Sequence, residues 1–177
     1  SISSIPTCHF EPRAIIGYDL ITSPSTMVTP YIGVGYRLFN DHMQKKYFGG
    51  YERESHYIYS PIGVETVTRV SDEWSWGTIA EFDLFWKGWQ ISHLNDVNPG
   101  FNKITNSQSR GYGLRGGAKL VKRGEQFDLT VGPYVRFWRI SKSNIEPLFL
   151  NGVFTGMGVF EPKNKSTEIG FNLSLQF

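Results

Sequence analysis

The last ten residues of the chain alternate without exception between apolar side chains and small or polar ones. One set is Ile169, Phe171, Leu173, Leu175 and Phe177, and the other is Glu168, Gly170, Asn172, Ser174 and Gln176. Successive side chains of a β-strand point to opposite faces of the sheet, so this two-residue period predicts a strand with one apolar face and one polar face. Such a strand has to separate two different environments.

The same period recurs in six earlier segments, near residues 13–20, 31–38, 57–65, 74–87, 112–120 and 127–138. No stretch of ten residues has the 3.6-residue period of a helix. A length of 177 residues suits one domain better than two. We therefore expect a single all-β domain over residues 1–177.

The connections between these segments alternate in length. Short, turn-like connections lie near residues 22–27, 71–73 and 122–126, and long polar ones near 40–51, 95–107 and 143–164. Short turns on one rim and long loops on the other are typical of bacterial outer-membrane barrels, with the turns periplasmic and the loops extracellular.

The polar faces carry charges of both signs in equal number. Six are basic and six are acidic, and they are interspersed with glycines: Arg13, Arg37, Lys87, Arg115, Lys119 and Arg136 against Asp19, Glu65, Glu81, Asp83, Asp128 and Glu168. Small residues and balanced charges suit the crowded interior of a narrow barrel, where ion pairs must be satisfied. We expect these twelve residues to form a charge network in the lumen.

Aromatic residues on the apolar faces are spaced as a membrane would require. Trp76 and Trp86 lie ten residues apart, and Phe127 and Phe137 repeat that spacing. Ten residues of a tilted strand rise by roughly 25 Å, which is the height of the apolar band between two aromatic girdles. With Trp74, these residues predict such girdles. The fold expected is a transmembrane antiparallel up-and-down β-barrel of about eight strands, and a soluble sandwich is the weaker alternative.

Closure of this barrel requires an eighth strand, because an open edge in hydrocarbon leaves backbone groups unpaired. We expect it before Arg13. The segment 148–160 is the alternative, although its use would invert the two rims.

The C-terminal segment, with Gly170, Phe171, Leu173, Leu175 and a final Phe177, resembles the assembly signal of outer-membrane barrels. Together with the alternation along the chain, it makes the sequence similar to the small eight-stranded barrels of the OmpA-type superfamily. The resemblance implies a Gram-negative outer membrane as location, and outer-membrane lipid and lipopolysaccharide as surroundings. It also implies the barrel-assembly machinery as a partner during biogenesis, and it fixes no function.

Catalytic chemistry has one weak candidate, the pair Ser92 and His93 at the end of a strand. Lipid A deacylases resemble it, but they place the serine two residues after the histidine, where this chain has Asn95. In a regular strand Ser92 and His93 point to opposite faces. The histidines show no metal-ligand spacing, so we expect neither metal nor cofactor.

The sequence leaves three functions open. A net charge of +2 provides no basic surface for nucleic acid. We expect a non-enzymatic outer-membrane barrel that acts in surface interaction or envelope scaffolding, with a surface or complex partner bound through the long loops. A narrow solute pore and a lipid-modifying enzyme are the alternatives.

Overall fold

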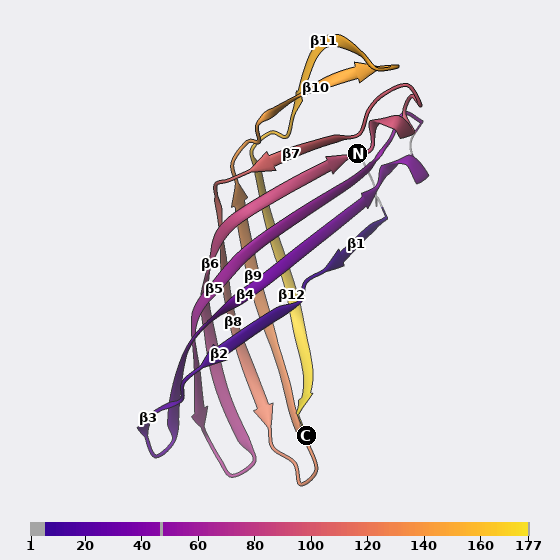
Figure 1. Cartoon of the computed structure of the whole chain (residues 1–177). Helices are drawn as coiled ribbons and strands as arrows, with labels where there is room; N and C mark the ends of the chain where they lie inside the picture. Colours follow the sequence, from indigo (N-terminus) through magenta and orange to yellow (C-terminus); the bar gives the residue numbers. More distant parts are fainter. Residues whose placement is uncertain (1–5, 47, 177) are drawn as a thin grey trace.

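The structure is a computed structural model that describes residues 6–46 and 48–176, and it consists almost entirely of antiparallel β-strands (Figure 1). The strands are β1 (Thr7–Phe10), β2 (Arg13–Gly17), β3 (Leu20–Ser23), β4 (Thr26–His42), β5 (Glu52–Arg69), β6 (Trp74–Ser92), β7 (Ile104–Gln108), β8 (Gly111–Lys122), β9 (Asp128–Ile140), β10 (Ile145–Leu150), β11 (Val153–Phe160) and β12 (Asn164–Gln176). Two short 3-10 turns, η1 (Met43–Lys45) and η2 (Leu94–Asp96), follow β4 and β6. Among the described residues, no helix has the length and apolar character needed to cross a membrane.

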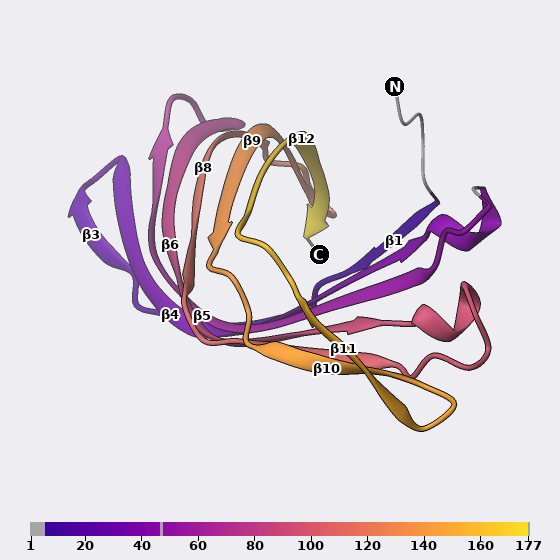
Figure 2. The same cartoon turned by 90° about the horizontal axis from the view of Figure 1, so that it is seen from above.

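Ten of the strands form one sheet whose order follows the chain, β1-β4-β5-β6-β8-β9-β12, with β2 and β3 also on β4 and β7 on β6. Each neighbouring pair is antiparallel, so the sheet is an up-and-down meander. The alternation predicted this all-β, antiparallel arrangement. The sheet curls strongly into a half-barrel (Figure 2).

The strand count differs from the expected eight, and the described sheet is open. The segments β1, β2 and β3 pair with successive stretches of β4, so they form one broken edge strand. The described residues before Arg13, in β1, therefore extend this edge strand, and they do not supply the separate eighth strand expected there. Pro12 lies at the first break and has no backbone N–H to donate. No described residue of β12 pairs with β1, β2 or β3.

The alternative eighth strand, 148–160, does not join the main sheet either. Its residues fall in the hairpin of β10 and β11, which forms a separate two-stranded sheet. The hairpin extends beyond the long-loop rim (Figure 1), and an isolated bridge between Phe101 and Leu150 ties it to the loop after β6.

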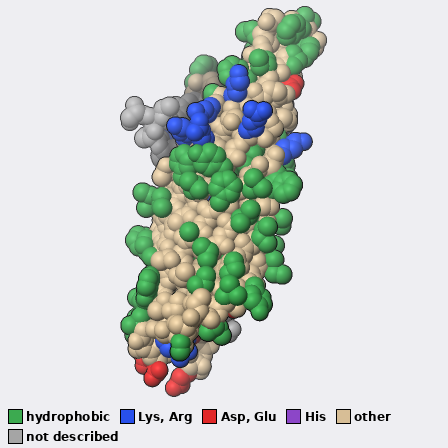
Figure 3. Space-filling model, turned by 90° about the vertical axis from the view of Figure 1, so that its left-hand side faces the viewer, with side chains coloured by type: hydrophobic (Ala, Val, Ile, Leu, Met, Phe, Trp, Pro, Cys, Tyr) green, Lys and Arg blue, Asp and Glu red, His purple; other side chains and the backbone are tan. Residues whose placement is uncertain are grey.

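The side chains of the main sheet divide between two faces. The concave face holds the aromatic and aliphatic core, Tyr57, Tyr59, Phe85, Trp138 and Ile140. The convex face leaves large apolar side chains exposed on β4, β5, β6, β8, β9 and β12, among them Val34, Ile62, Phe82, Leu114, Val135 and Ile169. Hydrophobic side chains are spread along the face of the molecule seen in Figure 3.

Glycines on the concave face make room for tyrosine rings. A Cβ atom on Gly170 would lie 2.8 Å from Cε1 of Tyr134, and one on Gly88 would lie 2.7 Å from Cδ1 of Tyr57. Both distances are too short for a real Cβ atom. The glycines thus let the half-barrel curl tightly around large side chains.

A register shift in β6 changes the face of one predicted residue. Ile58 of β5 pairs with Lys87, whereas the next residue, Tyr59, pairs with Phe85. Trp86 is the extra residue of this bulge, and both Trp86 and Lys87 are exposed. Strict alternation placed Lys87 on the polar inner face; the structure places it on the convex side because a β-bulge interrupts the two-residue period.

Candidate functional site

Glu11, between β1 and β2, is the centre of an ion network on the concave face. Its carboxylate contacts the guanidinium groups of Arg136, Arg37 at 3.3 Å and Arg115 at 3.6 Å, and accepts a hydrogen bond from the Tyr59 hydroxyl. Arg37 and Arg136 are only 1% and 2% exposed. Three cations from β4, β8 and β9 thus converge on one carboxylate.

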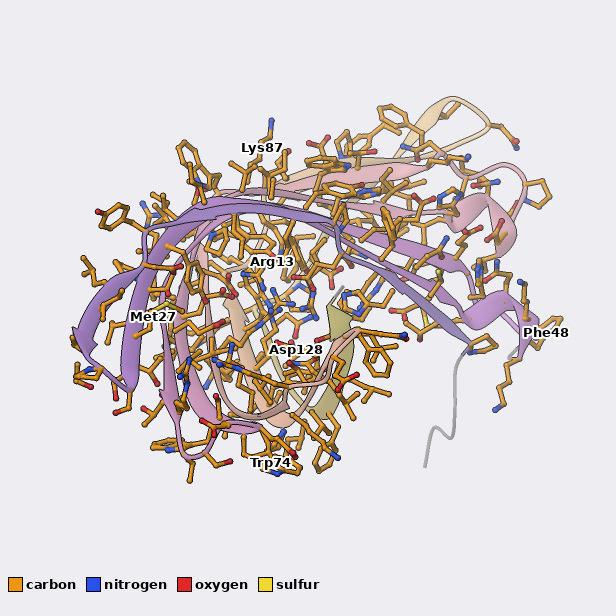
Figure 4. The ribbon with its side chains drawn as sticks, turned by 90° about the horizontal axis from the view of Figure 1, so that it is seen from below. Arg13, Met27, Phe48, Trp74, Lys87 and Asp128 are labelled. Atoms are coloured by element: carbon orange, nitrogen blue, oxygen red, sulfur yellow. The ribbon has the colours of Figure 1, made fainter. Side chains whose placement is uncertain are left out.

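A second carboxylate, Glu81 on β6, continues this network toward the short-turn rim. It pairs with Arg13, lies 3.5 Å from Nε of Arg115 and accepts a hydrogen bond of 2.7 Å from the Tyr31 hydroxyl. Asp83, two residues along β6, is fully buried and lies 3.4 Å from Nη2 of Arg136. Arg13 points into the space that the sheet encloses (Figure 4).

The remaining predicted lumen residues divide into two groups. Lys119 pairs with Glu65, and Arg37 pairs with Glu168 of β12. Asp19 instead is exposed and accepts a hydrogen bond from Thr29, and Asp128 lies at the start of β9, near the turn. Lys87 points away from the enclosed space (Figure 4). Nine of the twelve predicted residues therefore form ion pairs on the concave face, namely Arg13, Arg37, Glu65, Glu81, Asp83, Arg115, Lys119, Arg136 and Glu168.

Glu11 was missed because it lies outside every alternating segment. The twelve predicted charges balance, six against six, so the pattern called for no further carboxylate. Arg37 and Arg136 need a nearby anion on the same face, since buried charges are normally paired. Sequence alone could not tell which carboxylate supplies it.

Two cavities flank the network. The larger, about 420 Å³, lies toward the short-turn rim and is lined in part by Arg13, Glu81, Arg115 and Lys119. The smaller, about 110 Å³, lies toward the long-loop rim between β4, β5, β9 and β12. The buried side chains of Arg37, Arg136, Tyr59 and Trp138 fill the concave face between them.

The weak catalytic candidates Ser92 and His93 do not meet. Ser92 is buried, 3% exposed, with the inward-facing residues of β6, whereas His93 Nε2 lies 2.9 Å from Glu54. The other oxygen of Glu54 lies 3.2 Å from Nε2 of His56, whose Nδ1 is 2.6 Å from the Tyr36 hydroxyl. His93 thus belongs to a polar cluster near the long-loop ends of β4, β5 and β6, without the predicted serine.

A further ion pair links the concave face to the loop before β12. Arg53 of β5 lies 3.2 Å from Glu161 and 3.8 Å from Asp41. Burial raises the pKa of the Glu161 carboxyl above its ordinary value, and the charge of Arg53 offsets part of this rise. A second ion cluster, formed by Arg53, Asp41 and Glu161, thus lies at the long-loop rim.

The predicted girdle residues all lie on β6, on β9 or just before β9. Trp74, Trp76, Trp86 and Phe127 are exposed, and Phe137 is half-buried. Lys122 places its ammonium 5.6 Å from the ring of Trp74, and Trp86 donates a hydrogen bond to the Ser60 hydroxyl.

The predicted assembly signal coincides with the edge strand β12. Phe171, Leu173 and Leu175 are exposed on its apolar face, and Gly170 lies on the concave face against Tyr134. Phe177 lies outside the described residues.

No group of three or more His, Cys, Asp and Glu side chains in the described part of the chain is arranged to hold a metal ion. Compared with protein-family models, the sequence matches none, and the search of curated proteins also found no match.

Proposed function

We propose that this protein is a non-enzymatic outer-membrane protein whose convex face contacts lipid and whose long loops and protruding hairpin act in surface interaction or envelope scaffolding. The observation that carries the proposal is the inverted polarity of the sheet. Arginine and carboxylate side chains are buried on the concave face, while leucine, phenylalanine and tryptophan side chains are exposed on the convex face.

Hydrocarbon is the solvent that suits such an arrangement. Exposed apolar patches larger than a few hundred square ångströms are rare on soluble monomers. Here, the exposed apolar side chains continue across β4, β5, β6, β8, β9 and β12. An outward apolar band with a polar interior is the pattern of a transmembrane β-barrel.

In such a location the two edges of the sheet also meet hydrocarbon. Among the described residues, β12 has a ladder partner only in β9, and β2 and β3 have one only in β4. In hydrocarbon an unpaired backbone group costs several kcal/mol. In the membrane these edges must pair with each other or with a further strand. The ion pair between Arg37 of β4 and Glu168 of β12 already joins side chains from near the two ends of the sheet.

The hairpin supports a role at the surface. Ile145, Val153, Phe154 and Met157 are more than half exposed, although the hairpin lies beyond the main sheet. Exposed apolar clusters of this kind are typical of contact sites for other macromolecules.

The two alternatives receive less support. Buried arginines and aromatic rings fill the concave face between the two cavities, which argues against an open solute path. Ser92 is buried at the end of β6, whereas His93, which follows the strand, pairs with Glu54. The deacylase-like pair therefore lacks the contact between nucleophile and base that it requires.

Tryptophan quenching tests the membrane proposal. Two variants each keep a single tryptophan, either Trp86 on the convex face, 61% exposed, or the buried Trp138 on the concave face. Both are refolded into phosphatidylcholine vesicles that contain brominated acyl chains. We expect strong quenching of Trp86 and little quenching of Trp138. Equal quenching, or a wild-type chain that stays monodisperse and β-rich in buffer without any amphiphile, would contradict the proposal.

A further inference from the structure

Four exposed basic residues lie close together on the convex face, near the long-loop rim. Lys165 of β12 is the cross-strand partner of Arg139 of β9, and Arg139 is in turn the partner of Tyr112 of β8. Arg110 lies two residues before Tyr112, and Lys87 lies three residues beyond Leu84, the partner of Tyr112 on β6. We call Lys87, Arg110, Arg139 and Lys165 the basic belt.

The charge of the basic belt is not neutralised within the protein. In the part of the chain that the structure describes, no carboxylate lies within 4.0 Å of any of its four cationic groups. Lys and Arg side chains gather near the long-loop end of the convex face, whereas Asp and Glu gather mainly at the opposite end (Figure 3). The buried arginines, by contrast, all have carboxylate partners.

The pair Arg139 and Lys165 is the most informative part of the belt. Like charges directly opposite each other on neighbouring strands destabilise a sheet. Both side chains are exposed on the same face, so an anion that binds between them would remove this repulsion. A phosphate group accepts hydrogen bonds from a guanidinium and an ammonium at once.

The position of the belt identifies the kind of anion. The apolar side chains of Phe82, Leu114 and Val135 lie on the short-turn side of it along the same strands. A ligand that contacts both regions needs phosphate groups joined to acyl chains. The long-loop rim is the extracellular rim in bacterial barrels.

We infer that the basic belt binds the phosphate groups of a phosphorylated glycolipid in the outer leaflet, with the acyl chains of that lipid on the apolar band below. This inference rests on the proposed membrane location and adds a specific lipid partner to it. The belt residues are not part of the concave ion network, so they can be changed without opening that network.

The test compares two double variants that lose the same charge. Arg139→Gln/Lys165→Gln changes the belt, whereas Arg69→Gln/Lys122→Gln changes exposed basic residues near the short-turn rim. Each protein is refolded in zwitterionic detergent, and binding of diphosphorylated lipid A is measured by native mass spectrometry. Each basic group near an anionic lipid surface contributes on the order of a fivefold change in affinity, so we expect the belt variant to bind about 30-fold more weakly. The control should change by less than about threefold.

Lipid A without its phosphates and phosphatidylglycerol are the comparison ligands. Wild-type protein should bind both more weakly than diphosphorylated lipid A. Equal binding of the dephosphorylated lipid, equal binding of phosphatidylglycerol, or equal weakening in the two variants would overturn the inference. If the wild type and both variants insert into phosphatidylcholine vesicles but the binding results contradict the inference, only the lipid-binding role of the basic belt fails. If the wild type does not insert, the membrane proposal itself fails.

Discussion

The concave and convex faces of β6 differ residue by residue. Glu81 and Asp83 are 5% and 0% exposed, whereas the residues that alternate with them, Phe82 and Leu84, are 41% and 43% exposed. Water-soluble proteins show the opposite distribution, with charged residues almost never fully buried. The strand thus presents its charges to the interior and its apolar side chains to the surroundings.

This difference shows what holds the half-barrel together. The concave face is stabilised by Glu11, Glu81 and the arginines that contact them, together with aromatic rings packed over glycines. The convex face makes few contacts within the protein, and its stability depends on the solvent that surrounds it. Substitutions on the two faces should therefore respond differently to the presence of a bilayer.

The largest effect is expected from Arg136→Gln on the concave face. The substitution leaves Glu11 and Asp83 without their nearest cation, and an uncompensated buried charge costs about 3–5 kcal/mol. Urea unfolding of the refolded protein, followed by tryptophan fluorescence, measures this loss. Arg139→Gln, on the convex face three residues away, is the control and should change the free energy of unfolding by less than about 0.5 kcal/mol. Similar losses in both variants would mean that the ion network contributes no special stability.

A cation on the convex face gives the next largest effect. Leu84→Arg places a charge in the middle of the exposed apolar band, and in a bilayer this should destabilise the protein by about 2–4 kcal/mol. Val153→Arg in the exposed hairpin is the control, with an expected change within about 0.5 kcal/mol. Unfolding titrations in phosphatidylcholine vesicles compare the two. If Leu84→Arg is as mild as Val153→Arg, the convex face does not contact hydrocarbon.

The alternation of the sequence was enough to predict the antiparallel meander and the face of most residues. Strands with two different faces carry this information directly, because a one-residue slip would move every apolar side chain to the wrong side. That is why Arg13, Glu81 and Arg136 were found from sequence. Lys87 was not placed correctly, because the bulge at Trp86 adds one residue to the period.

Features set by contacts between distant segments could not be predicted in this way. Glu11 lies in a break between β1 and β2, and only the folded sheet brings it to Arg136, 125 residues away. The strands β10 and β11 also have apolar residues in alternation, but they pair with each other and not with the main sheet. Periodicity specifies faces and does not specify partners.

The third prediction compares one glycine from each face. Gly170→Ala on the concave face would place a Cβ atom 2.8 Å from the ring of Tyr134, whereas Gly116→Ala on the convex face meets nothing closer than 3.9 Å. Overpacking of this kind costs about 1–3 kcal/mol, and we expect Gly116→Ala to be close to neutral. Urea unfolding of both refolded variants provides the comparison. A neutral Gly170→Ala would show that the concave face has room to adjust.

The smallest effect concerns the ion pair of Arg53 and Glu161 at the long-loop rim. Burial raises the pKa of Glu161, so the folded state binds a proton more tightly there than the unfolded state does. The ionised carboxyl lowers the free energy of unfolding, and this loss is fully present above the raised pKa. It is relieved as the pH falls toward 4.5, the ordinary pKa of a glutamate.

Glu161→Gln should remove this part of the pH dependence. Because Arg53 lies 3.2 Å from Glu161 and both side chains remain in reach of water, the effect should stay below about 1 kcal/mol. Unfolding free energies of wild type and variant are measured from pH 7 to pH 4.5. As the pH falls, the wild type should gain up to this amount of stability relative to the variant. A constant difference across this range would mean that Glu161 is as well solvated in the folded protein as in the unfolded chain.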